Sequence, residues 1–168
     1  MRNNLLKMIA RSLVNFWQSP MTAGNNYTPM ERSNNSMDDS IREILSKSRT
    51  IAVVGLSNNP SRYSNLVAKY LKDHGYRIVP VNPNISEALG ESAYPDLNSI
   101  PFPVDLVDVF RNTQAAGAVV TQAIDLGIPV VWLQLGINLP DVQDLAANTA
   151  TICIDKCCIK AEHHRLMK

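Results

Sequence analysis

The loop after the first strongly apolar run of the chain carries the residue types of a phosphate site. Residues 51–62 read IAVVGLSNNPSR, so an apolar run ends at Gly55 and Leu56 and a polar loop with Ser57 and Asn58 follows. Backbone N–H groups in such a loop, and the N-terminus of a helix after it, favour an anion. The Ser57 hydroxyl and the Arg62 guanidinium, which offers bidentate donors to phosphate oxygens, can add to them.

This loop departs from two common nucleotide-binding motifs. A GxGxxG fingerprint that starts at Gly55 needs glycines at positions 57 and 60, where the chain has Ser57 and Pro60. Asn82 stands where an acidic residue usually binds a ribose hydroxyl, and no glycine-lysine-serine/threonine sequence occurs. Ordinary NAD binding and a Walker loop are therefore disfavoured. Two structural roles stay open: turn formation for Ser57 and Asn58, and a solvated charge for Arg62.

Acid/base chemistry has a weaker basis in the sequence. His163 and His164 lie beside Glu162 near the C-terminus, but a polar final helix at the sheet edge also explains them. No base adjoins Ser57 or a cysteine in the sequence in a way that would activate a nucleophile. We therefore expect binding without autonomous catalysis.

The candidate residues are positioned by an alternation of apolar runs and amphipathic segments. Buried parallel strands are expected at 51–56, 77–81, 104–110, 129–135 and 151–154. Helices are expected at 41–47, 65–74, 114–126 and 141–148, with irregular chain over 87–103. Gly75 and Gly127 stand where left-handed residues should end helices. The alternation predicts a doubly wound α/β domain with a mainly parallel five-stranded sheet.

In such a sheet, ligands bind beyond the carboxyl ends of the strands, where the strand order reverses. The residues at the expected strand ends are Gly55, Leu56, Ser57 and Asn58; Val81, Asn82 and Pro83; Phe110 and Arg111; and Gln134, Leu135 and Gly136. We expect these four groups to border one crevice, with Arg62 on the loop above it.

Residues 1–36 differ in composition from residues 37–168, which we expect to form the domain. The extension is basic up to Glu31 and rich in Asn and Ser, so it is expected to be flexible or a targeting segment, or to precede a later start codon. The expected location is the cytoplasm, or a mitochondrion or other organelle if the extension is a transit peptide.

Charge and hydropathy limit the classes of partner. From Ile41 onward the chain has 12 Lys or Arg and 12 Asp or Glu residues, so no net charge attracts nucleic acid or an anionic membrane over a distance. No apolar run approaches the roughly 18 residues that span a bilayer. We expect neither nucleic acid nor a membrane as a partner.

Several separated blocks resemble the small CoA-binding protein family. They are VVGLSxxPSR, VAKYLxxxGYRIVPVNP, LGExxYPxLxxIPxPVDLVDVFR, VVWLQLG and a CIKAEH-like ending, which together cover about Ile41 to Leu166. That family is similar to the N-terminal nucleotide-binding domain of the succinyl-CoA synthetase α subunit. The resemblance implies a single Rossmann-like domain with coenzyme A or an acyl-CoA as its ligand.

The resemblance also assigns roles to matching positions. It implies that Gly55, Ser57 and Arg62 contact the CoA pyrophosphate, and that Val81, Asn82 and Pro83 border the adenosine. The third and fourth strand ends would close the crevice. Many relatives have Arg-Pro-Ser-Tyr where this chain has Arg62-Tyr63-Ser64-Asn65; Ser64 is expected to remain as a helix cap, without the rigidity of a proline.

Three functional hypotheses follow. The first is a CoA or acyl-CoA binding module, acting as a sensor, a carrier or a subunit that depends on a partner enzyme. The others are an NAD(P)-using oxidoreductase-like enzyme and a regulatory interaction protein with a degenerate ligand site. A homodimer is also compatible with exposed apolar helix surface.

The cysteines allow a redox variant of the first hypothesis. Cys153, Cys157 and Cys158 lack a CxxC spacing, so no metal site is expected, and reduced thiols are the simplest interpretation. If Cys157 or Cys158 lies near the crevice mouth, oxidation could join it to the CoA thiol as a mixed disulfide.

Overall fold

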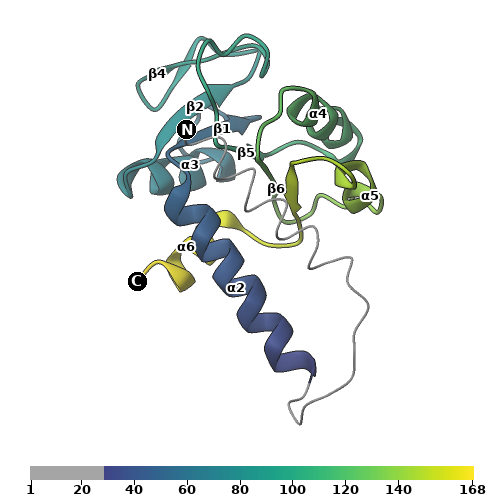
Figure 1. Cartoon of the computed structure of the whole chain (residues 1–168). Helices are drawn as coiled ribbons and strands as arrows, with labels where there is room; N and C mark the ends of the chain where they lie inside the picture. The colour runs from purple at the N-terminus through teal and green to yellow at the C-terminus, as the bar shows by residue number, and fades with distance from the viewer. Residues whose placement is uncertain (1–28) are drawn as a thin grey trace.

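A five-stranded parallel sheet forms the centre of the molecule, which a computed structural model describes for residues 29–168. Its strand order is β2-β1-β5-β6-β7, and every neighbouring pair is parallel (Figure 1). The strands are Thr50–Val54 (β1), Arg77–Val81 (β2), Leu106–Val109 (β5), Val130–Leu133 (β6) and Ile152–Ile154 (β7). The predicted Rossmann-like α/β fold is confirmed.

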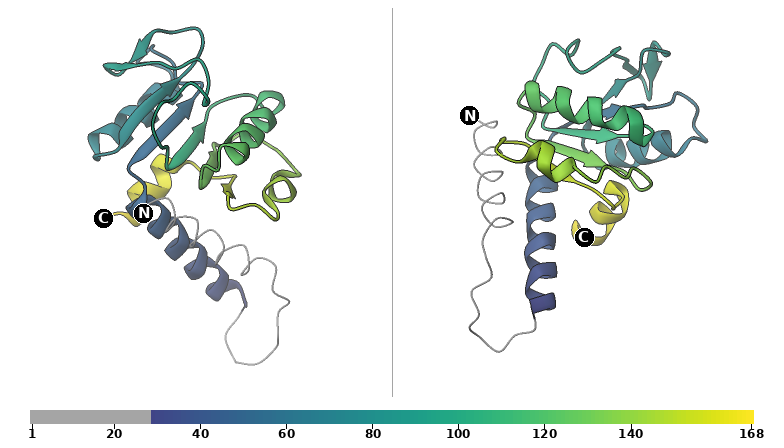
Figure 2. Two further views of the ribbon diagram at one scale, coloured as in Figure 1. Left: turned by 45° about the horizontal axis from the view of Figure 1, so that its top comes forward. Right: turned by 90° about the vertical axis from the view of Figure 1, so that its right-hand side faces the viewer.

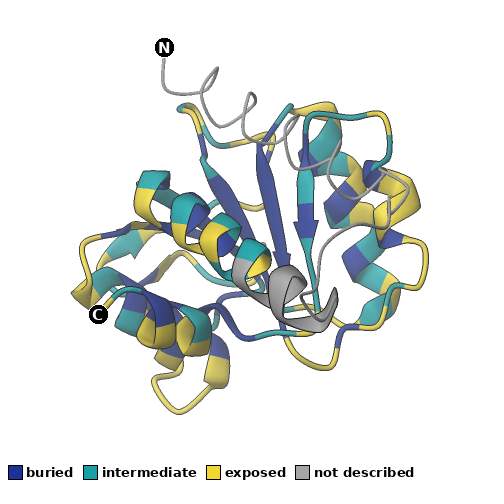
Figure 3. Ribbon diagram, turned by 60° about the horizontal axis from the view of Figure 1, so that its bottom comes forward, coloured by how far each residue is buried: buried dark blue, intermediate teal, exposed yellow. Residues whose placement is uncertain are grey.

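Helices cover both faces of the sheet, which is why its strands are mainly apolar, with Asp108 on β5 as a fully buried exception. One face packs against α2 (Pro29–Lys47), α3 (Tyr63–Asp73) and α6 (Ile159–Leu166), and the other against α4 (Thr113–Asp125) and α5 (Val142–Ala146) (Figure 2). Apolar residues at helical spacing make these contacts, as Val67, Ala68 and Leu71 do on α3. Figure 3 shows the resulting pattern of buried strands between helices with exposed outer faces.

Some boundaries differ from expectation. Helix α2 begins at Pro29 rather than near residue 41, and α3 begins at Tyr63 rather than at Asn65. A small antiparallel hairpin, β3 (Glu87–Ala88) with β4 (Glu91–Ser92), lies inside the segment expected to be irregular. The division at residue 36 stays a prediction, and residues 1–28, with the proposed targeting segment, lie outside the described residues.

The strand order reverses between β1 and β5. Strand β1 pairs with β2 on one side and β5 on the other, so the chain must cross over β1 to continue the sheet. This reversal separates the loops that leave β1 and β5 and creates the position where α/β sheets bind ligands. Within residues 29–168, no helix combines the length and the hydropathy needed to cross a membrane.

Candidate functional site

A cavity of about 590 Å³ opens at the carboxyl ends of β1, β5 and β6, at this reversal of strand order. We call it the crevice. Its lining comes from the loop after β1, the first turn of α3 and the segments after β2, β5 and β6. The lining residues are Gly55, Ser57, Ser61, Arg62, Tyr63, Ser64, Asn82, Phe110, Arg111, Gln134, Leu135 and Ile137.

Gly55 allows the two loops at the switch point to approach closely. Its φ is +88°, and a Cβ atom there would lie 2.2 Å from the carbonyl oxygen of Phe110. Both the backbone conformation and the space therefore require glycine. The Gly55 N–H donates to the Val81 carbonyl, and the Phe110 N–H donates to the Val54 carbonyl, each at 2.8 Å. These bonds fix the loop to both neighbouring strands.

The loop after β1 is held by its own polar side chains. The Ser57 N–H donates to Ser64 Oγ at 3.1 Å, and the Asn59 N–H donates to Ser57 Oγ at 3.2 Å. From α3, the Asn65 side chain donates to the Ser57 carbonyl at 2.8 Å. Two serine hydroxyls thus already accept hydrogen bonds from backbone N–H groups that the sequence analysis expected to bind a phosphate. An anion in the crevice would replace these hydroxyls as acceptor or bind beside them.

The start of α3 differs from the expectation that Ser64 caps this helix. Arg62, with an extended backbone, is the N-cap residue of α3, and its side chain makes no capping hydrogen bond. Ser64 lies inside the first turn, is buried and braces Ser57. The expectation that Ser64 caps the helix is therefore wrong, because Tyr63 already has helical geometry.

The electrostatics of the crevice favour an anion. Arg62 and Arg111 line it, and no carboxylate does among the described lining residues. Neither arginine forms a salt bridge within residues 36–168. The first turn of α3 contains no acidic residue, so the positive end of its dipole is uncompensated. Two guanidinium groups and a helix N-terminus can therefore share one anionic ligand.

Tyr63 forms one wall of the crevice. Its ring packs edge-to-face on Phe110 with centroids 6.0 Å apart, and its hydroxyl lies 2.9 Å from Cys158 Sγ. The Cys158 contact, with burial, raises the pKa of Tyr63 to about 12, so the phenol stays neutral. Tyr63 therefore joins the start of α3 to the start of α6 and leaves a large aromatic edge, about half exposed, beside the crevice.

A buried polar pair lies at the base of the crevice. Asp108, on the central strand β5, is fully buried and accepts a hydrogen bond from Gln134 Nε2 at 2.8 Å. Burial raises the pKa of Asp108 to about 7, and the hydrogen bond from Gln134 opposes that shift. Asp108 Oδ2 and Gln134 Oε1 have no hydrogen-bond partner.

Nine of the fourteen residues expected at the site line the crevice. The other five do not: Leu56 and Val81 are buried in the core, while Asn58, Pro83 and Gly136 are exposed beside the loops. Sequence reasoning did not assign Ser61, Tyr63 or Ile137 to the site. The sequence does place Tyr63 close to the expected start of a helix at residue 65. The direction in which its side chain points, however, depends on the first turn of α3, which begins at Tyr63 itself.

The C-terminal cysteines and histidines are not among the residues that line the crevice. Burial raises the pKa of Cys157 and of Cys153 to about 12, which keeps both as thiols. Cys158 reaches the crevice only through Tyr63. His163 is buried between α6 and α3, 3.1 Å from the Tyr70 hydroxyl, and burial lowers its pKa. The mixed disulfide stays a prediction, and His163 has a packing role.

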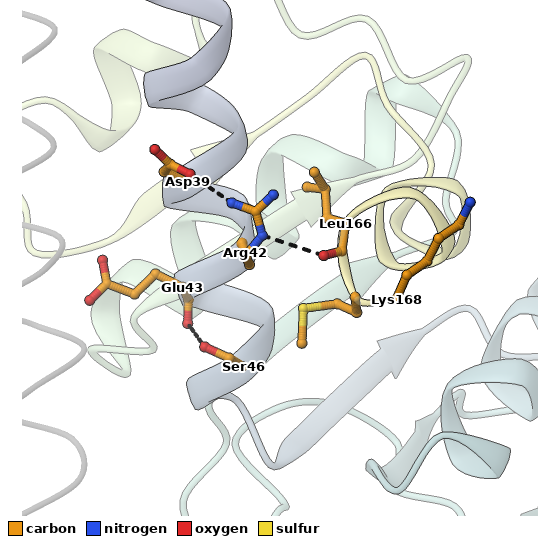
Figure 4. A pocket seen from close by; sticks show the side chains of 7 residues that line it. Asp39, Arg42, Glu43, Ser46, Leu166 and Lys168 are labelled. Carbon is orange, nitrogen blue, oxygen red and sulfur yellow. Dashed lines mark hydrogen bonds and ion pairs between the residues drawn. The ribbon is translucent and has the colours of Figure 1, made fainter.

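A second cavity, of about 510 Å³, lies between α2 and the C-terminal residues (Figure 4). We call it the α2 groove. Arg42 extends across it, donating to Asp39 Oδ1 at 2.6 Å and to the Leu166 carbonyl at 3.4 Å. Its arginine already has partners, and the two basic lining residues, Arg42 and Lys168, are matched by two acidic ones, Asp39 and Glu43. The α2 groove is therefore a poor anion site.

Comparison with known proteins places the chain in a family. Residues 49–164 match the model of the CoA binding domain. The chain is 44% identical over 124 residues to the uncharacterized protein YneT of Bacillus subtilis, covering 73% of this chain and 91% of that protein. It is also 34% identical to a hypothetical protein from Pyrococcus horikoshii OT3, with a TM-score of 0.75 and coverage of 90% and 100% of the two chains.

A shorter match reaches a CoA-using enzyme. Over 59 residues the chain is 42% identical to the α subunit of an ADP-forming acetate–CoA ligase from Pyrococcus furiosus. The match covers 34% of this chain and 13% of that subunit, so it concerns one domain of a larger protein. Together with the parallel sheet and its crevice, the matched residues 49–164 show that this chain belongs to the CoA-binding domain family.

Proposed function

We propose that the protein binds coenzyme A or an acyl-CoA in the crevice and does not itself catalyse a reaction on it. The observation that carries this proposal is the charge of the crevice at the switch point of a CoA-binding domain. Among the described residues, two arginines and no carboxylate line it, and neither arginine has an ion-pair partner within residues 36–168. The phosphates would lie against Arg62, Arg111 and the start of α3, because these groups supply the positive charge.

The rest of the ligand would follow the crevice walls. Asn82 is fixed by donating to the Leu56 carbonyl at 2.9 Å, which supports a border for the adenosine at the end of β2. Tyr63 and Leu135, both exposed, offer apolar surface for the pantetheine arm. The proposal has no catalytic step, since the lining pairs no hydroxyl or thiol with a histidine among the described residues. Any reaction would come from a partner enzyme.

Calorimetric titration with CoA, NAD and ADP in parallel, at fixed salt, tests the proposal. We expect CoA to bind more tightly than NAD, and Arg62→Ala to weaken CoA about tenfold or more, as loss of a charge-assisted hydrogen bond does. Lys69→Ala is the matched control, because Lys69 pairs with Asp73 farther along α3 and is not part of the lining.

Each alternative outcome has a defined meaning. Tighter NAD than CoA binding, with hydride transfer to a substrate, would support the oxidoreductase-like hypothesis instead. No binding of any of the three ligands would contradict the proposal and favour an interaction protein with a degenerate site.

A further inference from the structure

Two buried atoms without partners belong to side chains that already share one hydrogen bond. Gln134 Nε2 donates to Asp108 Oδ1 at 2.8 Å, while Asp108 Oδ2 and Gln134 Oε1 have no partner. Each unsatisfied buried acceptor costs free energy. Two such acceptors on one hydrogen-bonded pair, one of them charged, cost more. A single proton on Asp108 Oδ2 removes both costs, because that O–H can donate to Gln134 Oε1.

The surroundings of Asp108 favour the proton over a counter-ion. Its neighbours in register are Val53 on β1 and Trp132 on β6, both fully buried and neither charged. The same face of the sheet carries other titratable groups, which are Tyr63, Tyr70, Tyr76, Cys157, Cys158 and His163. Of these only His163 can become positively charged, and burial lowers its pKa. Among residues 36–168 no Lys, Arg or His forms an ion pair with Asp108, and Arg62 and Arg111 belong to the crevice above.

We infer that Asp108 is protonated in the ligand-binding state and forms a two-hydrogen-bond pair with Gln134, which holds the Gln134 amide so that its second N–H donates to the ligand. Gln134 lines the crevice although it is only 2% exposed. With one amide hydrogen on Asp108, one remains for an acceptor. The acceptor class is a carbonyl or phosphate oxygen of the bound molecule. Gln134 is then a binding residue and Asp108 a positioning residue.

Protonation also matters for charge. An ionised Asp108 would put a buried negative charge beneath a site whose other charges are two arginines, and it would oppose the Gln134 carbonyl. Both effects weaken an anionic ligand. The raised pKa of Asp108, caused by its burial, puts the transition within reach of neutral pH. This inference rests on the proposed function, because the ligand used to test it is CoA.

The test is calorimetric CoA titration of the full-length protein at about pH 6 and about pH 8.5. The wild type should lose about tenfold in affinity at the higher pH, since only the protonated fraction binds well. Asp108→Asn should change by less than about twofold, because an asparagine amide makes the same two hydrogen bonds to Gln134 at both values. Comparing variants at equal pH cancels titration of the ligand phosphates and of the histidines.

Controls separate this inference from a general effect of mutation. Asp38→Asn, on α2, should follow the wild-type pH dependence. Gln134→Leu should lower the affinity at both pH values, because the donated N–H is lost. If Asp108→Asn follows the wild-type curve, or if wild-type affinity does not fall with pH, the inference is overturned.

A measurement without ligand keeps the two proposals distinguishable. In carbon-13 NMR of the free protein, the chemical shift of the Asp108 carboxyl carbon should show a protonated carboxyl group at pH 6 that titrates near neutrality. An ionised Asp108 at pH 6 would overturn the pair even if CoA binds. Failure of CoA to bind at any pH, with a protonated Asp108, would instead overturn the proposed function and the role of Gln134 in it, and leave the pair intact.

Discussion

The crevice and the α2 groove have similar volumes, about 590 and 510 Å³, but the crevice is lined by two basic and no acidic residues, whereas the α2 groove has two of each. In the crevice, Arg62 and Arg111 have no acidic partner among the described residues, and the Asp108 carboxyl group at its base is buried and protonatable. In the α2 groove, Arg42 is already bonded to Asp39 and to the chain near the C-terminus (Figure 4). The comparison teaches that unpaired charge, rather than empty volume, distinguishes the proposed ligand site.

The strongest test of this contrast is to close the crevice with one methyl group. Gly55→Ala should destabilise the protein by about 4 kcal/mol and abolish CoA binding, because its Cβ would lie 2.2 Å from the Phe110 carbonyl at a φ of +88°. Gly136→Ala has the same φ but no atom within 4 Å of its Cβ, so it should cost only about 1 kcal/mol. Urea unfolding measures both, and equal costs would contradict the role of close approach.

The buried carboxyl group at the base of the crevice should make the stability of the protein depend on pH. The pKa of Asp108 rises from 3.8 to about 7 on folding, so the native state binds the proton more tightly than the unfolded state. This contribution to stability is full below about pH 4 and is lost as the pH rises through 7. Asp108→Asn should therefore be more stable than wild type at pH 8, by up to about 4 kcal/mol.

At about pH 4 this advantage should disappear, because both proteins then have a neutral group at position 108. Unfolding curves recorded across the pH range provide the measurement. A constant difference between the two proteins would show that Asp108 does not titrate with folding.

Removal of one guanidinium group from each cavity should affect CoA affinity in the crevice but not in the α2 groove. Arg111→Ala should weaken CoA about tenfold, or about 1.4 kcal/mol, with little change in the free energy of unfolding. Arg42→Ala should leave CoA affinity unchanged, because its bonds stay within the α2 groove. Titration and urea unfolding of the same two variants measure both quantities. A loss of CoA affinity in Arg42→Ala would contradict the assignment of the ligand to the crevice.

The smallest effect is expected for an ion pair beside the α2 groove. Arg165 makes two contacts of 2.6 Å with Asp38, which lowers the pKa of that carboxyl chiefly through the hydrogen bond. The pair is at the surface, so Asp38→Asn should cost no more than about 0.5 kcal/mol, and less at high salt. Thermal unfolding at low and high salt would detect this difference. A salt-independent loss above 1 kcal/mol would show that the pair is structural.

Much of the fold could be predicted because its signals are local. Aliphatic runs separated by amphipathic segments indicate a parallel sheet, and Gly75 and Gly127 have the left-handed conformation expected at helix ends. The residues at the expected strand ends then predict most of the crevice lining. The early start of α2 could not be predicted, since residues 29–40 have little apolar periodicity to mark a helix.

The missing parts of the site depend on tertiary geometry. The side chain of Tyr63 reaches Phe110 and Cys158 because α3 starts at that residue, a boundary that propensity does not fix to within two residues. From the sequence, Asp108 could be identified only as a polar residue within an expected buried strand. Its partner Gln134 is 26 positions away and meets it through the register of β5 with β6. Such a pair appears only when strands are aligned.

The crevice is assembled from segments that are far apart along the chain, from Gly55 to Ile137. A molecule bound there contacts residues from both halves of the domain at once, and none of these segments forms the site alone. Occupancy is therefore linked to global unfolding: at a hundredfold excess over its Kd, a ligand adds about 2.7 kcal/mol to stability. In a cell, the fraction of this protein that survives proteolysis would then rise and fall with the supply of its ligand, so abundance itself becomes a readout of that supply.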